Sequence, residues 1–340
     1  MKTHLPLVWV HLGPSRVSKH LKRSIKTHAI SFPESSLVLL VDEERNVEDF
    51  ALDNVKVIKV SIESEDWNFV EKTLNHDLTF RNGFWFTSLA RFKALSIFMA
   101  SEGIDKLLHI ESDVVLMPNF PFSKFAQMDD RLAYCLQGEG QGIAAILFVG
   151  SEDTLNNFLW FCVEEVKRNP KSTDMTILYR YWIEKPHQVL ILPSLPNNSC
   201  KPDDYPGTPK VISENLDTFG GIFDSISIGQ YLLGIDPRNS RGRRILFRED
   251  EAHYLKVSQF KLEIVQNSLF LDQQGKRYPI FSLHVHSKDL RAFGILSLKQ
   301  LLRKRILEMD QGEASELSIK EWFKSSYGVL RRRIHQRGQK

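Results

Sequence analysis

Apolar runs of strand length alternate with a segment of helical periodicity through the first 60 residues. Residues 5–12 and 37–41 are apolar enough to form buried strands, and a third strand is expected at residues 55–60. Between the first two, a basic segment from about residue 15 to residue 27 has the spacing of a helix. This order of strand, helix and strand is typical of a doubly wound α/β fold.

The alternation continues through the middle of the chain. A helix at residues 87–101 stops at Gly103, and a strongly apolar strand follows at residues 107–116. The further elements predicted here are strands at 132–136, 143–149 and 189–192 and a long helix at about 152–168, which Ser151 caps. We therefore predict an α/β fold built on a Rossmann-like mixed sheet flanked by helices.

After residue 192 the sequence predicts a long loop, a short helix, two strands and two C-terminal helices. Residues 193–209 are rich in proline and are expected to run over the surface, and residues 220–234 form a glycine hinge that leads into a short helix. Two strands are predicted at residues 262–271 and 279–286. Two amphipathic helices, at about residues 295–309 and 318–335, would then form a C-terminal helical appendage.

Composition indicates an ordinary globular protein. Of the 340 residues, 42% are hydrophobic and 26% are charged, and no segment approaches the roughly 18 apolar residues that a transmembrane helix needs. Cys135, Cys162 and Cys200 are widely spaced, which argues against a disulfide framework or a zinc site and favours a reducing, cytoplasmic compartment.

Charge is distributed unevenly. Residues 291–340 hold 12 Lys or Arg and 5 Asp or Glu, a net charge of +7, and the whole chain has +3, so the preceding 290 residues carry −4. A nucleic-acid-binding domain would show a basic face throughout, and this distribution therefore argues against nucleic acid as a partner.

Two acids interrupt the apolar strand at residues 107–116. Alternation along a strand would place Glu111 and Asp113 on one face, where like charges repel unless a cation lies between them. Oxygen ligands suit Mg²⁺ or Mn²⁺, and such an ion would neutralise a diphosphate at the carboxyl end of the strand. The alternative is that Glu111 faces a helix N-terminus and Asp113 caps a turn.

The helix with Arg91, followed by the strand with its Glu-Ser-Asp triplet, resembles the helix and D-x-D block of GT-A glycosyltransferases, here in an E-x-D form. The resemblance spans roughly residues 5–290. It implies a GT-A fold, a nucleotide-sugar donor with UDP-sugars favoured, Mn²⁺ or Mg²⁺, and a sugar or lipid-linked sugar as acceptor. It also implies that Arg91 lies near the donor phosphates, that Asp113 binds the metal, and that Glu111 binds the metal or the ribose.

A second cluster follows late in the chain. His284, His286 and Lys288 alternate along the predicted strand, so an imidazole could complete the metal site and a lysine could meet a diphosphate. His286 and Lys288 resemble the late histidine and lysine of glycogenin-type enzymes, which bind metal and phosphate, and His284 is a further candidate for donor binding. His11 ends the first strand and could meet the nucleotide. The alternative is a solvated face or a satisfied core pair of histidines.

Two more acids are candidates for the general base that an inverting enzyme needs at the acceptor hydroxyl. Asp224, at the glycine hinge, is the first choice, and Asp174, before the helix at residues 175–182, is the second. Either acid could instead simply cap the helix that follows it.

These observations divide the chain into a catalytic domain at 1–290, with a nucleotide-binding half at about 1–120 and an acceptor half at about 121–290, and a basic amphipathic tail at 291–340. The tail could pack on the domain or lie as a peripheral contact on the inner face of an anionic membrane.

The predicted function is metal-dependent transfer of a sugar from a nucleoside diphosphate sugar to a hydroxyl acceptor, in surface polysaccharide or glycoconjugate synthesis. Two alternatives remain open. One is nucleotidylyl transfer to a sugar phosphate, and the other is a non-enzymatic protein that binds a membrane surface or nucleic acid through its basic tail.

Overall fold

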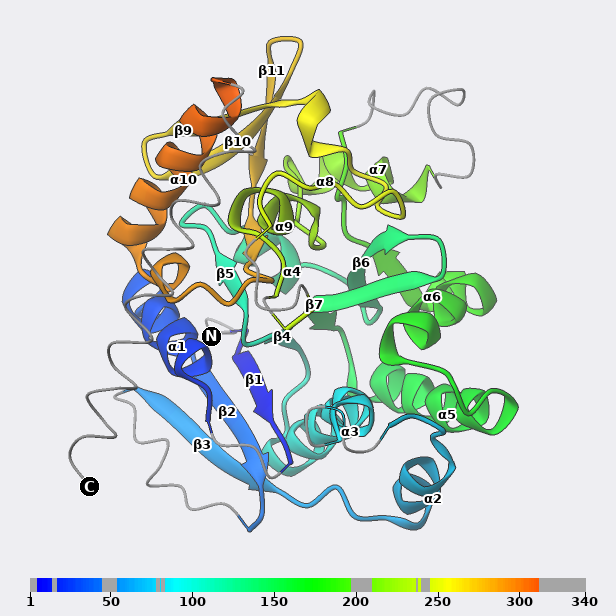
Figure 1. Cartoon of the computed structure of the whole chain (residues 1–340). Helices are drawn as coiled ribbons and strands as arrows, with labels where there is room; N and C mark the ends of the chain where they lie inside the picture. The colour runs from blue at the N-terminus through cyan, green and yellow to red at the C-terminus, as the bar shows by residue number, and fades with distance from the viewer. Residues whose placement is uncertain are drawn as a thin grey trace, which may run out of the picture.

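A mixed seven-stranded sheet forms the centre of the molecule (Figure 1). The computed structural model describes residues 5–13, 17–44, 54–77, 80, 83–196, 210–236, 238–239 and 245–311. The strand order is β3-β2-β1-β4-β7-β6-β8. The strands of this sheet are β1 (Leu7–His11), β2 (Leu37–Asp42), β3 (Val55–Val60), β4 (Leu107–Ile110), β6 (Leu132–Gly138), β7 (Gln141–Val149) and β8 (Val189–Ile191).

The sheet separates two hydrophobic cores because alternate residues of each strand face opposite sides. On β1, Val8 joins a core that contains Leu89 and Phe92, whereas Leu7 and Trp9 join a second core on the other face. β1 runs parallel to β2 and β4, and β7 is antiparallel to β4 and β6. The predicted fold class, an α/β sheet of mixed direction flanked by helices, is confirmed.

Helices cover both faces of this sheet. α3, α5 and α6 contribute to the core with Val8, and α1 and α4 contribute to the core with Trp9 (Figure 1). The helices are α1 (Lys19–Ser31), α2 (Glu65–Thr73), α3 (Phe84–Glu102), α4 (Phe122–Ala126), α5 (Glu152–Arg168), α6 (Asp174–Glu184), α7 (Val211–Glu214), α8 (Leu216–Phe219), α9 (Ser227–Leu233) and α10 (Ile295–Asp310). The basic helix predicted at about 15–27 thus begins and ends four residues later, and α2, α4, α7 and α8 were not predicted.

The strand predicted at residues 107–116 is two strands in two sheets. β4 ends at Ile110, and β5 (Val114–Leu116) pairs antiparallel with β12 (Ser282–His284) outside the main sheet. Between them the chain turns, with a hydrogen bond of 3.2 Å from Val114 N to Glu111 O. The single-strand prediction was wrong because the apolar run continues through the change of sheet.

The strand predicted at residues 262–271 is a hairpin. β9 (Lys261–Val265) and β10 (Ser268–Gln273) meet at Gln266, whose φ of 58° allows the tight reversal, and β11 (Lys276–Ile280) completes a three-stranded sheet. The single strand predicted at 279–286 was also wrong, because it covers the end of β11 and the whole of β12, which lie in different sheets, and β12 ends at His284.

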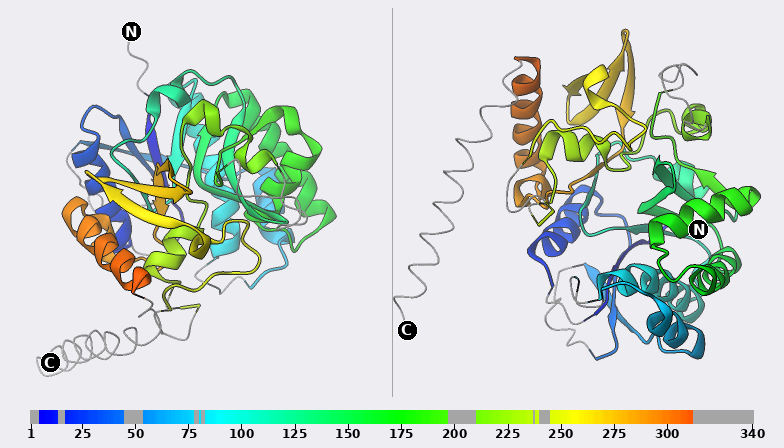
Figure 2. Two further views of the ribbon diagram at one scale, coloured as in Figure 1. Left: turned by 90° about the horizontal axis from the view of Figure 1, so that it is seen from above. Right: turned by 45° about the vertical axis from the view of Figure 1, so that its right-hand side comes forward.

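The C-terminal helix α10 packs on the body of the molecule. Leu298, Leu301, Leu302 and Ile306 are buried, and two views show α10 beside α1 (Figure 2). The helix predicted at 318–335, most of the proline-rich segment and Cys200 lie outside the described residues. Among the helices that the structure describes, none combines the length and hydrophobicity needed to cross a bilayer.

Candidate active site

A cleft with a volume of ≈ 840 Å³ lies at the carboxyl ends of β1 and β4. This is the edge at which open α/β sheets bind their ligands. Its walls come from the end of β1, the start of α1, α3, the turn between β4 and β5, the start of α6, the β6–β7 hairpin and the segment after β12. Of the nine predicted site residues, all except Asp224 line this cleft: His11, Arg91, Glu111, Asp113, Asp174, His284, His286 and Lys288.

Glu111, Asp113 and His284 converge in this cleft. One possible ligand atom from each side chain lies within 4.8 Å of the other two. Among the described residues, this is the group of His, Cys, Asp or Glu side chains that could hold a metal ion. His284 Nε2 is 3.6 Å from Asp113 Oδ2 and 3.9 Å from Glu111 Oε2. The pairing of β12 with β5 brings this late histidine to the two acids.

A backbone hydrogen bond on the side away from the acids fixes the orientation of the His284 imidazole. His284 Nδ1 lies 2.9 Å from the carbonyl oxygen of Ser225, to which it donates a hydrogen bond. Nε2 is therefore the nitrogen that faces the carboxylates, and this arrangement is typical of histidines that bind metals.

Two basic side chains flank the acids. Arg91, on α3, donates hydrogen bonds to Glu111 and to Asp174, the latter over 2.6 Å. Lys288 donates to Asp113 Oδ2 over 2.8 Å and reaches within 3.7 Å of Asp236 Oδ2. The backbone of Lys288 has a φ of 54°, a conformation rare for residues other than glycine and common at functional sites.

Burial and charge shape the acid–base properties of the cluster. Burial alone would lower the pKa of His284, but Asp113 and Glu111 outweigh it and raise this pKa to about 9. Burial would likewise raise the pKa of Asp113, but Lys288 and His284 hold it well below the usual range. Asp113 is therefore ionised at neutral pH, and His284 carries the proton that a metal ion would displace.

These residues fit a divalent cation. Two carboxylates and a neutral imidazole form a mixed oxygen and nitrogen ligand set that is suited to Mn²⁺ and can also hold Mg²⁺. Among the described residues, Glu111, Asp113 and His284 are the group that could hold such an ion.

His286, predicted as a metal ligand, is placed differently. Its Nδ1 accepts a hydrogen bond of 3.1 Å from the backbone N–H of Asp236. The strand ends before it, at His284, so the predicted alternation does not continue to His286. Among the described residues, His284 takes the position beside the acids that the sequence had assigned to His286.

Asp224 does not line the cleft. Its carboxylate is buried and accepts hydrogen bonds from three backbone N–H groups: Ile228 at 2.9 Å, Gly229 at 2.8 Å and His284 at 2.9 Å. Burial raises the pKa of Asp224, against the effect of these donors. This geometry corresponds to the alternative reading of Asp224, in which the acid caps the helix α9 and, here, also anchors β12.

Asp174 is the acid of this pair that lines the cleft. It is the first residue of α6, whereas the side chain of Thr173 caps the helix by accepting from Thr176 N. The expectation that Asp174 is itself the N-cap was therefore wrong. Burial raises the pKa of Asp174, and Arg91 opposes this shift.

The cleft also contains polar residues that the sequence did not single out. His109 and Gln141 line it, and each has a buried side-chain atom for which the described part of the chain offers no hydrogen-bond partner. Asp236, which is not in the lining, forms ion pairs with the cleft residues Lys288 and Arg238. These residues lie in unrelated elements without a shared motif, so no sequence signal connected them.

The chain resembles solved structures but matches no protein-family model and no curated sequence. Among solved structures, the PaToxG glycosyltransferase matches with 13% identity and a TM-score of 0.38, over 53% of this chain and 69% of that one. The galactosyltransferase LgtC, in complex with donor and acceptor sugar analogues, matches with 16% identity and a TM-score of 0.40, over 56% and 73%.

A third matching structure is not a glycosyltransferase. A cytidylyltransferase from Leptospira borgpetersenii has 12% identity and a TM-score of 0.34, over 58% of this chain and 78% of that one. Glycosyltransferases are thus among the structures that this chain resembles. All of these TM-scores are below 0.5, so the likeness alone assigns no family and no activity to the chain.

Proposed function

We propose that this chain is a glycosyltransferase that moves a sugar from a nucleoside diphosphate sugar to a hydroxyl acceptor. The observation that carries the proposal is the convergence of Glu111, Asp113 and His284 at the carboxyl end of β4, with Arg91 and Lys288 on either side. Acids that can bind a cation, next to basic side chains, suit a diphosphate.

The basic residues have distinct tasks in this proposal. Lys288, on a short turn after β12, donates to Asp113 and would be available to bind the diphosphate if a cation were held by that carboxylate. Arg91 is held on both sides by Glu111 and Asp174, so its guanidinium keeps one orientation in the wall of the cleft. We assign it the role of orienting the donor near its reacting carbon.

Asp174 is the carboxylate that we propose as general base. It lines the cleft, and its raised pKa makes it a better proton acceptor than an exposed aspartate. In the transfer, the bond from the sugar to the diphosphate breaks, the acceptor oxygen forms the new bond, and the acceptor proton moves to Asp174. We assign no catalytic role to Asp224, whose oxygens are occupied by backbone donors.

A divalent cation held by Glu111, Asp113 and His284 would supply charge neutralisation for the departing diphosphate. Mn²⁺ and Mg²⁺ are the candidates. We further propose that the donor is a UDP-sugar, that the acceptor is a sugar or lipid-linked sugar, and that the product is a surface polysaccharide or glycoconjugate. The resemblance of the sequence to GT-A enzymes supports these finer assignments.

A donor screen tests the proposal. The full chain is incubated with a panel of nucleotide sugars and Mn²⁺, and free nucleoside diphosphate and pyrophosphate are measured separately. Slow release of nucleoside diphosphate from one donor is expected, and Asp113→Asn should abolish it. Release of pyrophosphate from a nucleoside triphosphate and a sugar phosphate would instead identify a nucleotidylyltransferase.

A further inference from the structure

The outward side of α1 is a row of cations. Lys19, Lys22, Arg23 and Lys26 follow the spacing i, i+3, i+4 and i+7, so they lie on one side of the helix, and all four are exposed. The range Lys19–Ser31 contains no Asp or Glu. The opposite side of the helix, with Leu21 and Ile25, is buried in the core. The cations therefore form a face of the molecule rather than scattered surface charges.

The outward side of α10 combines cations with aliphatic side chains. Leu296 is 76% exposed and Leu307 is 58% exposed, although the inward residues of the same helix are buried. Arg303 and Lys304 lie between these two leucines and are exposed. On α1, Ile30 continues the cationic row and is 61% exposed. Exposed aliphatic side chains that lie among basic residues are the combination found on helices that lie at a membrane surface.

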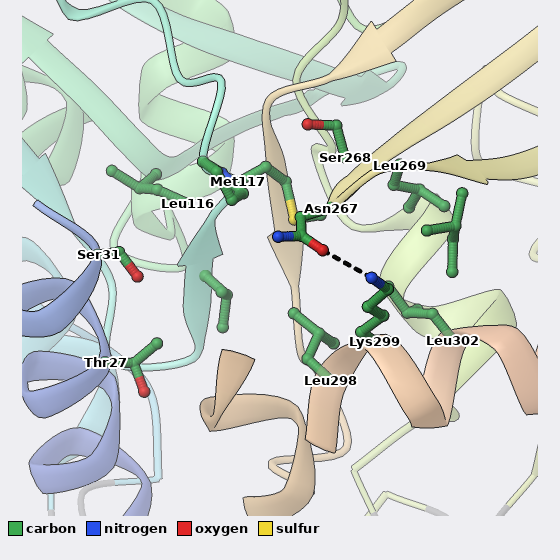
Figure 3. A pocket seen from close by; sticks show the side chains of 13 residues that line it. Thr27, Ser31, Leu116, Met117, Asn267, Ser268, Leu269, Leu298, Lys299 and Leu302 are labelled. Atoms are coloured by element: carbon green, nitrogen blue, oxygen red, sulfur yellow. Dashed lines mark hydrogen bonds between the residues drawn. The ribbon is translucent and has the colours of Figure 1, made fainter. Parts of the chain in front are cut away.

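α1 and α10 form one side of the molecule. Arg23 donates to the carbonyl of Leu290 over 2.9 Å, and Thr27 donates to the carbonyl of Phe293 over 2.6 Å, just before α10 begins. A small pocket is lined by α1 residues and by α10 residues together, and Lys299 of α10 bonds to Asn267 across it (Figure 3). Figures 1 and 2 show the two helices on the same side in all views. We call the exposed residues of these two helices the α1–α10 face.

We propose that the α1–α10 face binds the surface of a bilayer that contains anionic phospholipid. Basic residues attract the negative headgroups, each strengthening binding roughly fivefold, and exposed aliphatic side chains enter the boundary between headgroups and acyl chains. A nucleic acid would match the charges equally well but would leave Ile30, Leu296 and Leu307 without a favourable environment. The three aliphatic side chains therefore favour a membrane as the partner.

This inference does not depend on sugar transfer, because the residues that carry it lie outside the cleft. It also differs from the prediction that the basic tail contacts the membrane. α10 belongs to that tail, but its main apolar stripe packs inward, and α1 comes from the first part of the chain.

Vesicle flotation of the full chain tests the proposal. Vesicles of neutral phosphatidylcholine are compared with vesicles that also contain phosphatidylglycerol, at low and high salt. The double variant Lys26→Glu/Arg303→Glu changes one cation on each helix. The matched control, Lys72→Glu/Lys185→Glu, makes the same charge change on α2 and at the end of α6, on the opposite side in Figure 1.

Wild type and control are expected to float with the anionic vesicles only, and less at high salt. The face variant should bind at least roughly tenfold more weakly. Leu296→Gln/Leu307→Gln should also bind severalfold more weakly, with an unchanged melting temperature because both side chains are exposed. Equal binding by Lys26→Glu/Arg303→Glu and by the control would overturn the proposal. All variants keep residues 312–340, so a difference between them cannot come from that basic segment. Failure of wild type to bind anionic vesicles, or binding to a nucleic acid duplex instead, would overturn it as well.

Discussion

Lys288 donates a hydrogen bond of 2.8 Å to Asp113, the acid that we propose as a ligand of the cation. The two residues come from opposite parts of the chain, and the pairing of β5 with β12 brings them together. The lysine charge therefore competes with a divalent cation for the same carboxylate.

Replacement of Lys288 should separate metal binding from donor binding. In Lys288→Ala, Mn²⁺ alone should bind roughly tenfold more tightly, because a like charge is removed from the site. The nucleotide-sugar donor should bind more weakly, because its diphosphate loses a basic partner. Calorimetry with Mn²⁺ and then with donor measures both effects, and Lys288→Arg serves as the charge-preserving control. Weaker binding of Mn²⁺ to Lys288→Ala would contradict this arrangement.

The two buried acids Asp113 and Asp224 should respond differently to removal of their charge. Asp113→Asn should lower activity roughly 100-fold or more, because a ligand of the cation is lost. Asp224→Asn should lower the free energy of unfolding by about 2 kcal/mol, because three backbone N–H groups lose a charged acceptor. Folded Asp224→Asn protein should keep most of its activity. Urea denaturation and donor hydrolysis, measured on both variants, distinguish these outcomes.

Arg91 should matter for stability as well as for activity. Arg91→Met leaves Glu111 and Asp174 without their common partner, which should cost about 3 kcal/mol of unfolding free energy. Adding Asp174→Asn to this variant should recover part of the stability and none of the activity. If the double variant is less stable than Arg91→Met alone, the two acids are not coupled through Arg91.

His28 should make the fold sensitive to mild acid. Its Nδ1 donates to the carbonyl of Ser24 and its Nε2 accepts from the N–H of Leu116, so the ring is neutral, and burial lowers its pKa to about 4. The unfolded chain binds a proton below about pH 6.5. The stability from neutral His28 is therefore complete above that pH and is lost as the pH falls towards 4.

At pH 5 this loss should amount to about 2 kcal/mol relative to pH 7. His28→Gln keeps one donor and one acceptor but does not titrate, so its stability should fall less between these two pH values. Urea denaturation at pH 7 and pH 5 measures the difference. If the unfolding free energies of wild type and His28→Gln fall equally between pH 7 and pH 5, His28 is not the group that causes the acid sensitivity.

Elements with strong local signals were predictable from the sequence. α5 begins after Ser151, whose hydroxyl accepts from Thr154 N, and the predicted bounds of this helix match the observed Glu152–Arg168. β3 was predicted with the same accuracy. By contrast, Val114–Leu116 is as apolar as Leu107–Ile110, so nothing local revealed that the chain changes sheets between them.

The candidate site was predictable only in part, for the same reason. The acids at 111 and 113 stand beside each other in the sequence, but the choice between His284 and His286 depends on where β12 ends. Likewise, an acid before a helix can serve as a cap or as a base. The hydrogen bond from His284 N to Asp224, which favours the structural role, joins segments far apart in the chain.

The two-stranded pairing of β5 with β12 has a consequence for the order in which the protein matures. The ribosome releases Glu111 and Asp113 long before it releases His284. A partly synthesised chain would therefore hold both acids without the imidazole. The three ligands can therefore act together only after β12 has paired with β5, so the cation site is completed late in the production of the protein.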